Sequence, residues 1–268
     1  DDISEAWRSL RQAFDYFARA GNVERAVDVA FYAGSDLELT RPSQAQLLER
    51  ALALVQEGSE GYGRLQAALG QSLGMMGQVE PADQAFARAR EVAERMQLPR
   101  LELDVLRLSH YVIGFQMRLD EATAIGDRVI ELAQQLNEPH IEATAHFFNH
   151  GQWWRRRVDE GRAHADACLR LGKQLGVPYL LATAAFAQAT MAAMEGRWDD
   201  AVGHAEWGLE ASPLDQRLIG QLSAFAAVRG NTEMANSHFR RLIETVEMVP
   251  PGPGLEWTTL TNVAVRLA

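Results

Sequence analysis

The hexapeptide Gly196-Arg197-Trp198-Asp199-Asp200-Ala201 returns 34 residues later as Gly230-Asn231-Thr232-Glu233-Met234-Ala235. Related turns run from Gly21 to Ala26 and from Gly77 to Ala82, without glycine from Arg118 to Ala122, and in a weaker form from Arg157 to Gly161. Glycine ends a helix, an acidic residue favours the start of the next one, and a small residue lets the two helices cross closely. The repeated motif therefore predicts antiparallel helix pairs.

Two independent signals give the period of these pairs. The small residues that follow the turns are Ala26, Ala82, Ala122, Gly161, Ala201 and Ala235, at spacings of 56, 40, 39, 40 and 34 residues. The corners between pairs carry Pro99, Pro139, Pro178 and Pro213, at spacings of 40, 39 and 35 residues. Proline stops one helix and suits the first turn of the next. Both signals indicate units of about 40 residues in the central part of the chain.

The composition favours an ordered, all-α chain. Of the 268 residues 47% are hydrophobic, and Val, Ile and Thr never form the alternating runs that strands require. We expect a single solenoid over residues 1–268, of about six helix pairs plus one extra helix. Its expected parts are a first pair at 1–34, an extra helix at 43–57, further pairs at 61–98, 99–138, 139–177, 178–212 and 213–249, and the start of a further helix at 255–268.

Charge and cysteine content exclude several classes of function. The formal charge of −10 would repel a phosphate backbone, so no nucleic acid is expected to bind through this segment. The single cysteine, Cys168, cannot form an internal disulfide, and its apolar neighbours indicate a buried thiol. No run of 18 apolar residues and no signal sequence occurs, so we expect no membrane partner and a cytoplasmic location. The absence of an initiator methionine suggests a piece of a longer protein.

The 34-residue spacing equals the tetratricopeptide period. The longer units, which end in pieces such as residues 88–94 and 128–133, resemble the tetratricopeptide sensor regions of bacterial STAND signalling ATPases, LuxR-type transcription activators and cyclase-associated regulators. The resemblance covers residues 4–247 and implies a right-handed superhelical solenoid that binds a protein, a peptide or a small effector. No phosphate loop ending in Gly-Lys-Ser/Thr and no basic recognition helix is present, so any ATPase or DNA-binding part would lie elsewhere.

The resemblance also implies that ligands contact the concave face, which the first helices of the pairs line. The register of the turns predicts that this face carries Arg107, Tyr111, His146, His150, Trp153, Trp154, Phe186 and Thr190. Most of these aromatic and histidine residues fall in one expected helix, Ile141 to Arg155. Aromatic and arginine side chains are common binding anchors.

Other interpretations of these residues stay open. The tryptophans and neighbouring phenylalanines can simply fill the core between helices. His146 and His150 lie one turn apart, as in some metal sites, but they lack the glutamate of the zinc-protease pattern. We predict neither a metal nor a cofactor.

Catalysis is not expected either. No Gly-x-Ser-x-Gly elbow occurs, and the paired carboxylates lie at helix starts, where the helix dipole explains them. The prediction is a non-catalytic binding module. The alternative is a structural scaffold that associates with itself.

Overall fold

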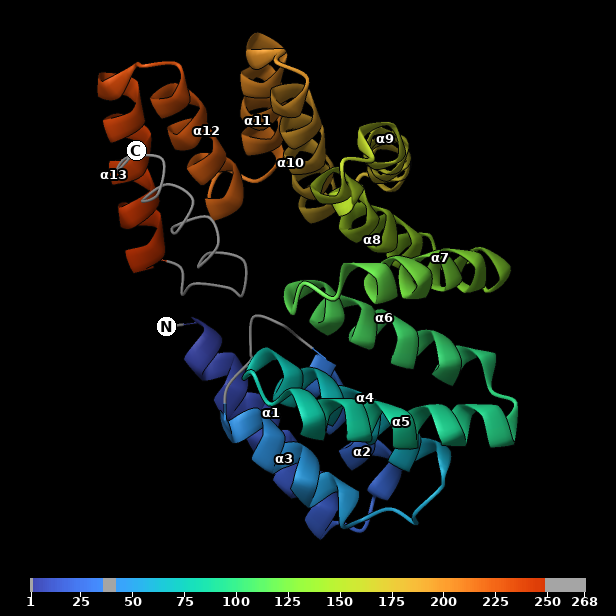
Figure 1. The fold of residues 1–268 in the computed structure, drawn as a ribbon. Coiled ribbons are helices and arrows are strands. Elements are labelled where there is room, and N and C mark those ends of the chain that lie inside the picture. Colours follow the sequence, from blue (N-terminus) through green and yellow to red (C-terminus); the bar gives the residue numbers. More distant parts are fainter. Residues whose placement is uncertain (1, 36–41, 249–268) are drawn as a thin grey trace. The chain divides into compact units, whose positions relative to one another are not determined.

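The structure, a computed structural model, describes residues 2–35 and 42–248 (Figure 1). These residues form helices and no strand, which confirms the all-α prediction. The expected helix at 255–268 lies outside the described residues. The helices are α1 (Asp2–Arg19), α2 (Val23–Ser35), α3 (Pro42–Leu52), α4 (Glu60–Met75), α5 (Val79–Met96), α6 (Pro99–Phe115), α7 (Leu119–Gln135), α8 (Pro139–Asn149), the 3-10 helix η2 (His150–Arg155), α9 (Val158–Leu175), α10 (Pro178–Met194), α11 (Trp198–Ala211), α12 (Gln216–Val228) and α13 (Thr232–Met248).

The chain divides into two compact units, residues 1–136 and residues 137–268. We call them the N-terminal unit and the C-terminal unit. The boundary lies at the corner that Pro139 marks in the sequence. Each unit has its own buried core.

In the N-terminal unit, tight turns join α1 to α2, α4 to α5 and α6 to α7 (Figure 1). Helices α2, α4 and α6 contact one another in that order, and α3 packs against both α2 and α4. One continuous hydrophobic cluster extends from Trp7 to Val112. The extra helix therefore belongs to the core of this unit. It ends at Leu52, five residues earlier than expected.

Helix α4 lies in the middle of the N-terminal unit and is held very closely by its neighbours. A Cβ atom on Gly70 would come within 2.8 Å of the Phe86 ring on α5, and one on Gly74 within 2.2 Å of Val112 on α6. These two glycines allow α5 and α6 to approach the backbone of α4. Close approach of this kind is a specific use of glycine inside a helix.

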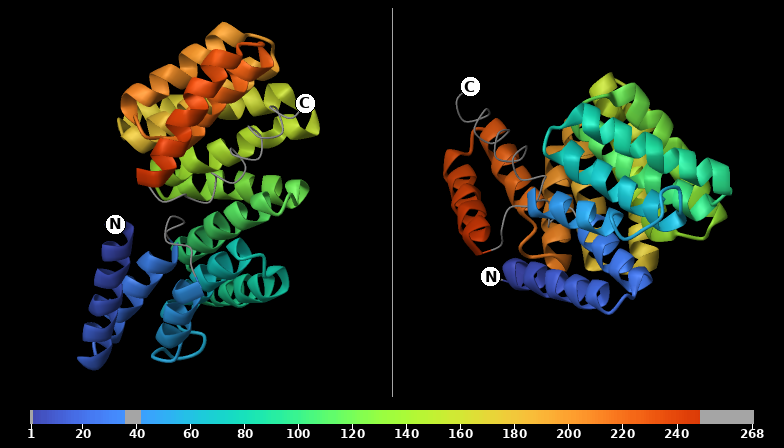
Figure 2. Two further views of the ribbon diagram at one scale, coloured as in Figure 1. Left: turned by 90° about the vertical axis from the view of Figure 1, so that its left-hand side faces the viewer. Right: turned by 90° about the horizontal axis from the view of Figure 1, so that it is seen from below.

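The C-terminal unit consists of the pairs α8/α9, α10/α11 and α12/α13, the last of which is drawn in orange and red in Figure 2. Helices α8, α10 and α12, the first helices of these pairs, contact one another in that order. Six alanines of α10 are completely buried, which lets its neighbours pack closely around it. They are Ala182, Ala184, Ala185, Ala187, Ala189 and Ala192.

The turns inside the pairs share one backbone feature. Five residues before each small residue of the aligned column, the backbone is left-handed, with φ between 59° and 78°. The residues at this position are Gly21, Gly77, Met117, Arg156, Gly196 and Gly230. All six small residues of the column are buried, as the close crossing of the helices requires. Two turns thus use an ordinary L-residue where the other four use glycine.

Two expectations about helix boundaries are wrong. The helix expected from Ile141 to Arg155 ends at Asn149 and continues as the 3-10 helix η2, which contains Gly151. Glycine is a weak helix former, and a tighter turn is a common way for a helix to end. Pro99, Pro139 and Pro178 begin helices, but Pro213 does not. Helix α12 begins at Gln216 because the Asp215 carboxylate accepts hydrogen bonds from the backbone of Arg217 and Leu218.

Candidate functional site

An aromatic cluster lies where α8 meets α10 in the C-terminal unit. The Phe147 ring stacks on the imidazole of His150, with centroids 5.1 Å apart, and meets the Phe186 ring edge-on at 6.0 Å. His150 and Phe186 are also in edge contact, at 6.5 Å. The structure therefore brings the predicted residues His150 and Phe186 together, with Phe147 between them.

Arg217 on α12 completes this cluster and was not among the residues predicted from the sequence. Its guanidinium carbon lies 5.8 Å from the Phe147 ring centroid, 5.4 Å from that of Tyr179 and 5.9 Å from that of Phe186. Cation–π attraction at such distances stabilises the arrangement. The signal that could have found Arg217 was its place in the first helix of the last pair. The three rings come from two other helices, Phe147 from α8 and both Tyr179 and Phe186 from α10, so no sequence pattern around Arg217 predicts the contact.

Further hydrogen bonds hold the guanidinium in place. Arg217 Nη2 donates to Asp215 Oδ2 at 2.6 Å and to Thr183 Oγ1 at 3.1 Å. The Asp215 side chain is only 8% exposed, so this is a largely desolvated ion pair. Tyr179, in contrast, is 55% exposed. The cluster thus combines a rigid cation with an aromatic ring that faces solvent.

The predicted residue Thr190 lies one turn beyond Phe186 and belongs to a polar link between α10 and α12. Its hydroxyl donates to the Phe186 carbonyl at 2.9 Å. Gln221 Nε2 donates to the Thr190 hydroxyl at 2.8 Å and to the same carbonyl at 3.2 Å. The link fixes the register of the two first helices.

His146 pairs with a histidine of a second helix, His164 on α9. The two Nδ1 atoms are 2.9 Å apart, so one ring donates a proton and the other accepts it. Burial lowers the pKa of His146 to about 4, with help from the nearby charges of His164 and Arg170. His150 donates from Nδ1 to the Phe147 carbonyl, and burial lowers its pKa to about 4 as well. Both histidines are therefore neutral at pH 7.

Arg107 and Tyr111 lie on α6, in the N-terminal unit. Arg107 Nε donates to Asp104 Oδ1 at 2.8 Å, and the Tyr111 ring lies 4.6 Å from that of Phe115. The structure does not describe the side chains of Trp153 and Trp154, although their backbone forms part of η2. Their role in binding stays a prediction.

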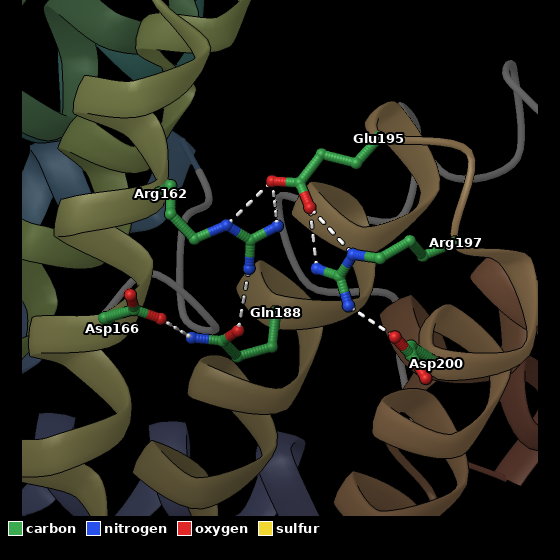
Figure 3. Close-up of polar contacts among 6 residues, drawn as sticks. All are labelled: Arg162, Asp166, Gln188, Glu195, Arg197 and Asp200. Atoms are coloured by element: carbon green, nitrogen blue, oxygen red, sulfur yellow. Dashed lines mark hydrogen bonds and ion pairs between the residues drawn. The ribbon is translucent and has the colours of Figure 1, made fainter.

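A chain of ion pairs runs from α9 to the turn between α10 and α11 (Figure 3). Arg162 Nε and Arg197 Nε each donate to the Glu195 carboxylate at 2.8 Å, and Arg197 also pairs with Asp200. Burial raises the pKa of Glu195, but the hydrogen bonds from Arg162 and Arg197 outweigh this effect and lower it. An open hollow of about 330 Å³ lies beside this turn. The two arginines and two carboxylates of these ion pairs balance in charge. We therefore assign to the ion pairs the role of holding the neighbouring helix pairs in register.

A second polar link, made of hydrogen bonds through a neutral amide, joins α9 to the middle of α10 (Figure 3). Gln188 accepts from Arg162 at 3.2 Å and donates to Asp166 at 2.8 Å. Gln188 is buried, so both halves of its amide are satisfied where water does not reach.

Several kinds of site have no counterpart in residues 2–35 and 42–248. No group of three or more His, Cys, Asp or Glu side chains could hold a metal ion there. Cys168 is completely buried, as predicted, and burial raises its pKa to about 12. The thiol is therefore not a nucleophile. None of the helices in this part of the chain is long and apolar enough to span a membrane.

Comparison with known proteins supports the fold. No family model matches the sequence, and no curated protein matches it. Among solved structures, a STAND protein with a tetratricopeptide repeat sensor from Pyrococcus horikoshii is similar to 99% of the chain, with a TM-score of 0.65 and 14% identity. PilF from Pseudomonas aeruginosa is similar to 97% of it, with a TM-score of 0.53 and 15% identity.

The matched part is 42% of the STAND protein and 99% of PilF. The chain thus spans less than half of the length of the STAND protein. The observed helix pairs and these two neighbours together show that the chain has a tetratricopeptide-like, all-α fold.

Proposed function

We propose that this chain is a non-catalytic binding module that recognises a protein or peptide through the first helices of its pairs. The observation that carries the proposal is the cluster of Phe147, Tyr179, Phe186 and Arg217 on α8, α10 and α12. Tyrosine and arginine are enriched among the residues that dominate binding energy at protein interfaces. Here both belong to one cluster, and the arginine is already held in place, so a partner would lose little entropy in ordering it.

The kind of partner follows from the exposed part of the cluster. Tyr179 offers a large ring with a polar hydroxyl, which suits contact with an apolar side chain and a peptide group at once. The Thr190 hydroxyl and the amide nitrogen of Gln221 are already engaged with each other and with the Phe186 carbonyl. An extended peptide segment that lays an apolar or aromatic side chain on Tyr179 fits this surface better than a small polar effector.

The wider setting we propose is the sensor part of a cytoplasmic signalling protein. The Pyrococcus horikoshii neighbour is a STAND protein with a tetratricopeptide repeat sensor, and 42% of its chain has a fold similar to this one. The LuxR-type and cyclase-associated regulators that the sequence resembles would be the corresponding bacterial cases. Nucleotide hydrolysis and DNA binding would then belong to other parts of the parent protein.

Selection of a peptide from a random 12-residue phage library on the purified chain, followed by fluorescence anisotropy, tests the proposal. Tyr179→Ala should weaken binding of the selected peptide about tenfold, because a hot-spot tyrosine contributes roughly 1 to 2 kcal/mol. Tyr16→Ala is the matched control, since Tyr16 is a 66% exposed tyrosine of the N-terminal unit. Equal binding by wild type and Tyr179→Ala would rule out this surface for that peptide.

Light scattering separates the binding module from the alternative, a self-associating scaffold. A chain that stays monomeric at all concentrations and binds one peptide per molecule fits the module. Concentration-dependent oligomers that form without any ligand would favour the scaffold.

A further inference from the structure

Leu214, two residues before α12, is an exposed apolar residue that none of the contacts described above uses. It is 48% exposed, and Tyr179, at the start of α10, is 55% exposed. Each of the two directly follows a corner proline, Pro213 or Pro178. At the two earlier corners an arginine or a histidine takes this place. Among the four corners with proline, the last two therefore present a large apolar side chain at the start of the first helix.

A hydrogen bond fixes which part of α10 lies beside which part of α12. Arg217 Nη2 donates to Thr183 Oγ1 at 3.1 Å, so these two residues are neighbours across the two helices. Tyr179 lies one helical turn before Thr183, and Leu214 lies three residues before Arg217. The two exposed side chains therefore lie at the same end of adjacent first helices. Packed helices have axes about 8–10 Å apart, which sets the separation of the two side chains.

This separation selects the conformation of a bound peptide. In a polyproline II helix, residues three apart lie on the same side, about 9 Å from each other. In a β-strand the residues on one side recur at every second position, about 7 Å apart, which is too short. An α-helical partner would need a continuous apolar groove. Here, however, charged side chains adjoin both apolar residues and interrupt such a groove.

The charged side chains beside the two apolar residues belong to one ion pair. The guanidinium carbon of Arg217 lies 5.4 Å from the Tyr179 ring centroid, and Asp215 follows Leu214 directly. Arg217 Nη2 and Asp215 Oδ2 are 2.6 Å apart, so their charges cancel. A charged peptide residue would lose hydration here without meeting an unpaired charge of opposite sign. The surface is thus complementary in charge to an uncharged segment.

We propose that Tyr179 and Leu214 together bind a polyproline II segment that carries two apolar side chains three residues apart, with uncharged residues between them. Proline itself suits the intervening positions, because it stabilises this conformation and lowers the entropy lost on binding. The inference rests on the proposed function, since Tyr179 takes part in both. Its new element is Leu214, which determines specificity: Tyr179 alone accepts peptides of any spacing, whereas the pair selects one spacing.

The test compares the binding of two labelled peptides to the full chain by fluorescence anisotropy. In fluorescein-Pro-Pro-Leu-Pro-Pro-Leu-Pro-Pro-amide the leucines are three residues apart, and in fluorescein-Pro-Pro-Leu-Pro-Leu-Pro-Pro-Pro-amide they are two apart. We expect the first peptide to bind about tenfold more tightly, the usual effect of one good apolar contact. Equal binding of the two, tighter binding of the second, or no measurable binding of either would overturn the inference.

Three variants assign the effect to Leu214. Leu214→Ala should weaken binding of the first peptide about tenfold and should remove the difference between the two peptides. Leu214→Met, which keeps an apolar side chain of similar size, should retain the difference. Met194→Ala is the matched control, because Met194 is 49% exposed at the opposite end of α10, and it should change nothing. An equal loss in Met194→Ala and Leu214→Ala would indicate general apolar attraction and would refute the pair of anchors.

The peptide selected from the phage library separates this inference from the proposed function. If Tyr179→Ala weakens binding of the selected peptide but the two proline peptides bind equally well, the proposed function stands and the spacing rule fails. If neither Tyr179→Ala nor Leu214→Ala changes the binding of any of these peptides, both fail.

Discussion

At the scale of single residues, the turns inside the pairs place one residue each in the left-handed region. Glycine adopts this conformation without a Cβ penalty, whereas for other residues it costs about 1 kcal/mol or more. Met117 and Arg156 adopt it with φ of 59° and 61°. The sequence motif without glycine from Arg118 to Ala122 is thus the same turn under backbone strain.

Met117→Gly should therefore raise the free energy of unfolding by roughly 0.5 to 1 kcal/mol. Met117 is 47% exposed, so the loss of its side chain removes few contacts. Urea denaturation measures the change. Met96→Gly is the control, because Met96 is 44% exposed but is the last helical residue of α5, where glycine lowers stability. If both variants lose stability equally, the turn at Met117 is not strained.

His146 and His150 make stability depend on pH. Their pKa values in the folded chain are about 4, below the ordinary value of 6.5, so between these limits the unfolded chain binds more protons. The free energy of unfolding should have its full value above pH 6.5 and should fall as the pH drops towards 4. The decrease should reach up to roughly 1.4 kcal/mol per pH unit for each of the two histidines.

His150→Gln removes one of these titrations and should flatten the dependence in that window, which urea unfolding at several pH values measures. His140→Gln, at an exposed position in the first turn of α8, is the control and should keep the wild-type slope. An unchanged slope in His150→Gln would show that His150 is not the titrating group.

At the scale of the element, α4 depends on glycines for its fit between α5 and α6. Overpacking of a buried contact typically costs 1 to 3 kcal/mol. A Cβ on Gly74 would meet Val112 at 2.2 Å, whereas one on Gly114, in α6, would meet nothing within 4 Å.

We expect Gly74→Ala to lower the free energy of unfolding by about 2 kcal/mol. Gly114→Ala, the same change in an open position of a helix, should raise it by roughly 0.5 to 1 kcal/mol. Thermal or urea unfolding followed by circular dichroism measures both. Opposite signs for the two variants support the close fit of α4, and a gain of stability in Gly74→Ala would contradict it.

At the scale of the whole molecule, the chain consists of two units with separate cores. The cluster from Trp7 to Val112 is made only by residues of the N-terminal unit. In repeat proteins each pair contacts chiefly its neighbours, so a set of adjacent pairs carries its own stability.

Residues 1–136 expressed alone should accordingly fold, with a helical circular dichroism spectrum and a cooperative thermal transition. A fragment of residues 1–118 lacks α7, the partner of α6, and should melt at a lower temperature. A fragment of residues 1–136 without any cooperative transition would show that this unit needs the rest of the chain.

The sequence by itself determined the repeated part of the structure. The glycine turns, the small-residue column and three of the four prolines mark helix ends correctly, because capping, left-handed turns and close crossings depend on residues a few positions apart. Where the local signal is weaker, the prediction was wrong: α8 ends at Asn149, and α12 is started by Asp215 rather than Pro213.

The tertiary structure alone decided how the side chains of the first helices meet. The predicted residues His150 and Phe186 meet in one cluster, but Arg217, which completes that cluster, and His164, which pairs with the predicted His146, come from other helices. In the same way, Phe31 joins Arg64 and Arg107 across three helices. Such contacts depend on the packing of helices that are distant in the sequence, for which helical periodicity carries no signal.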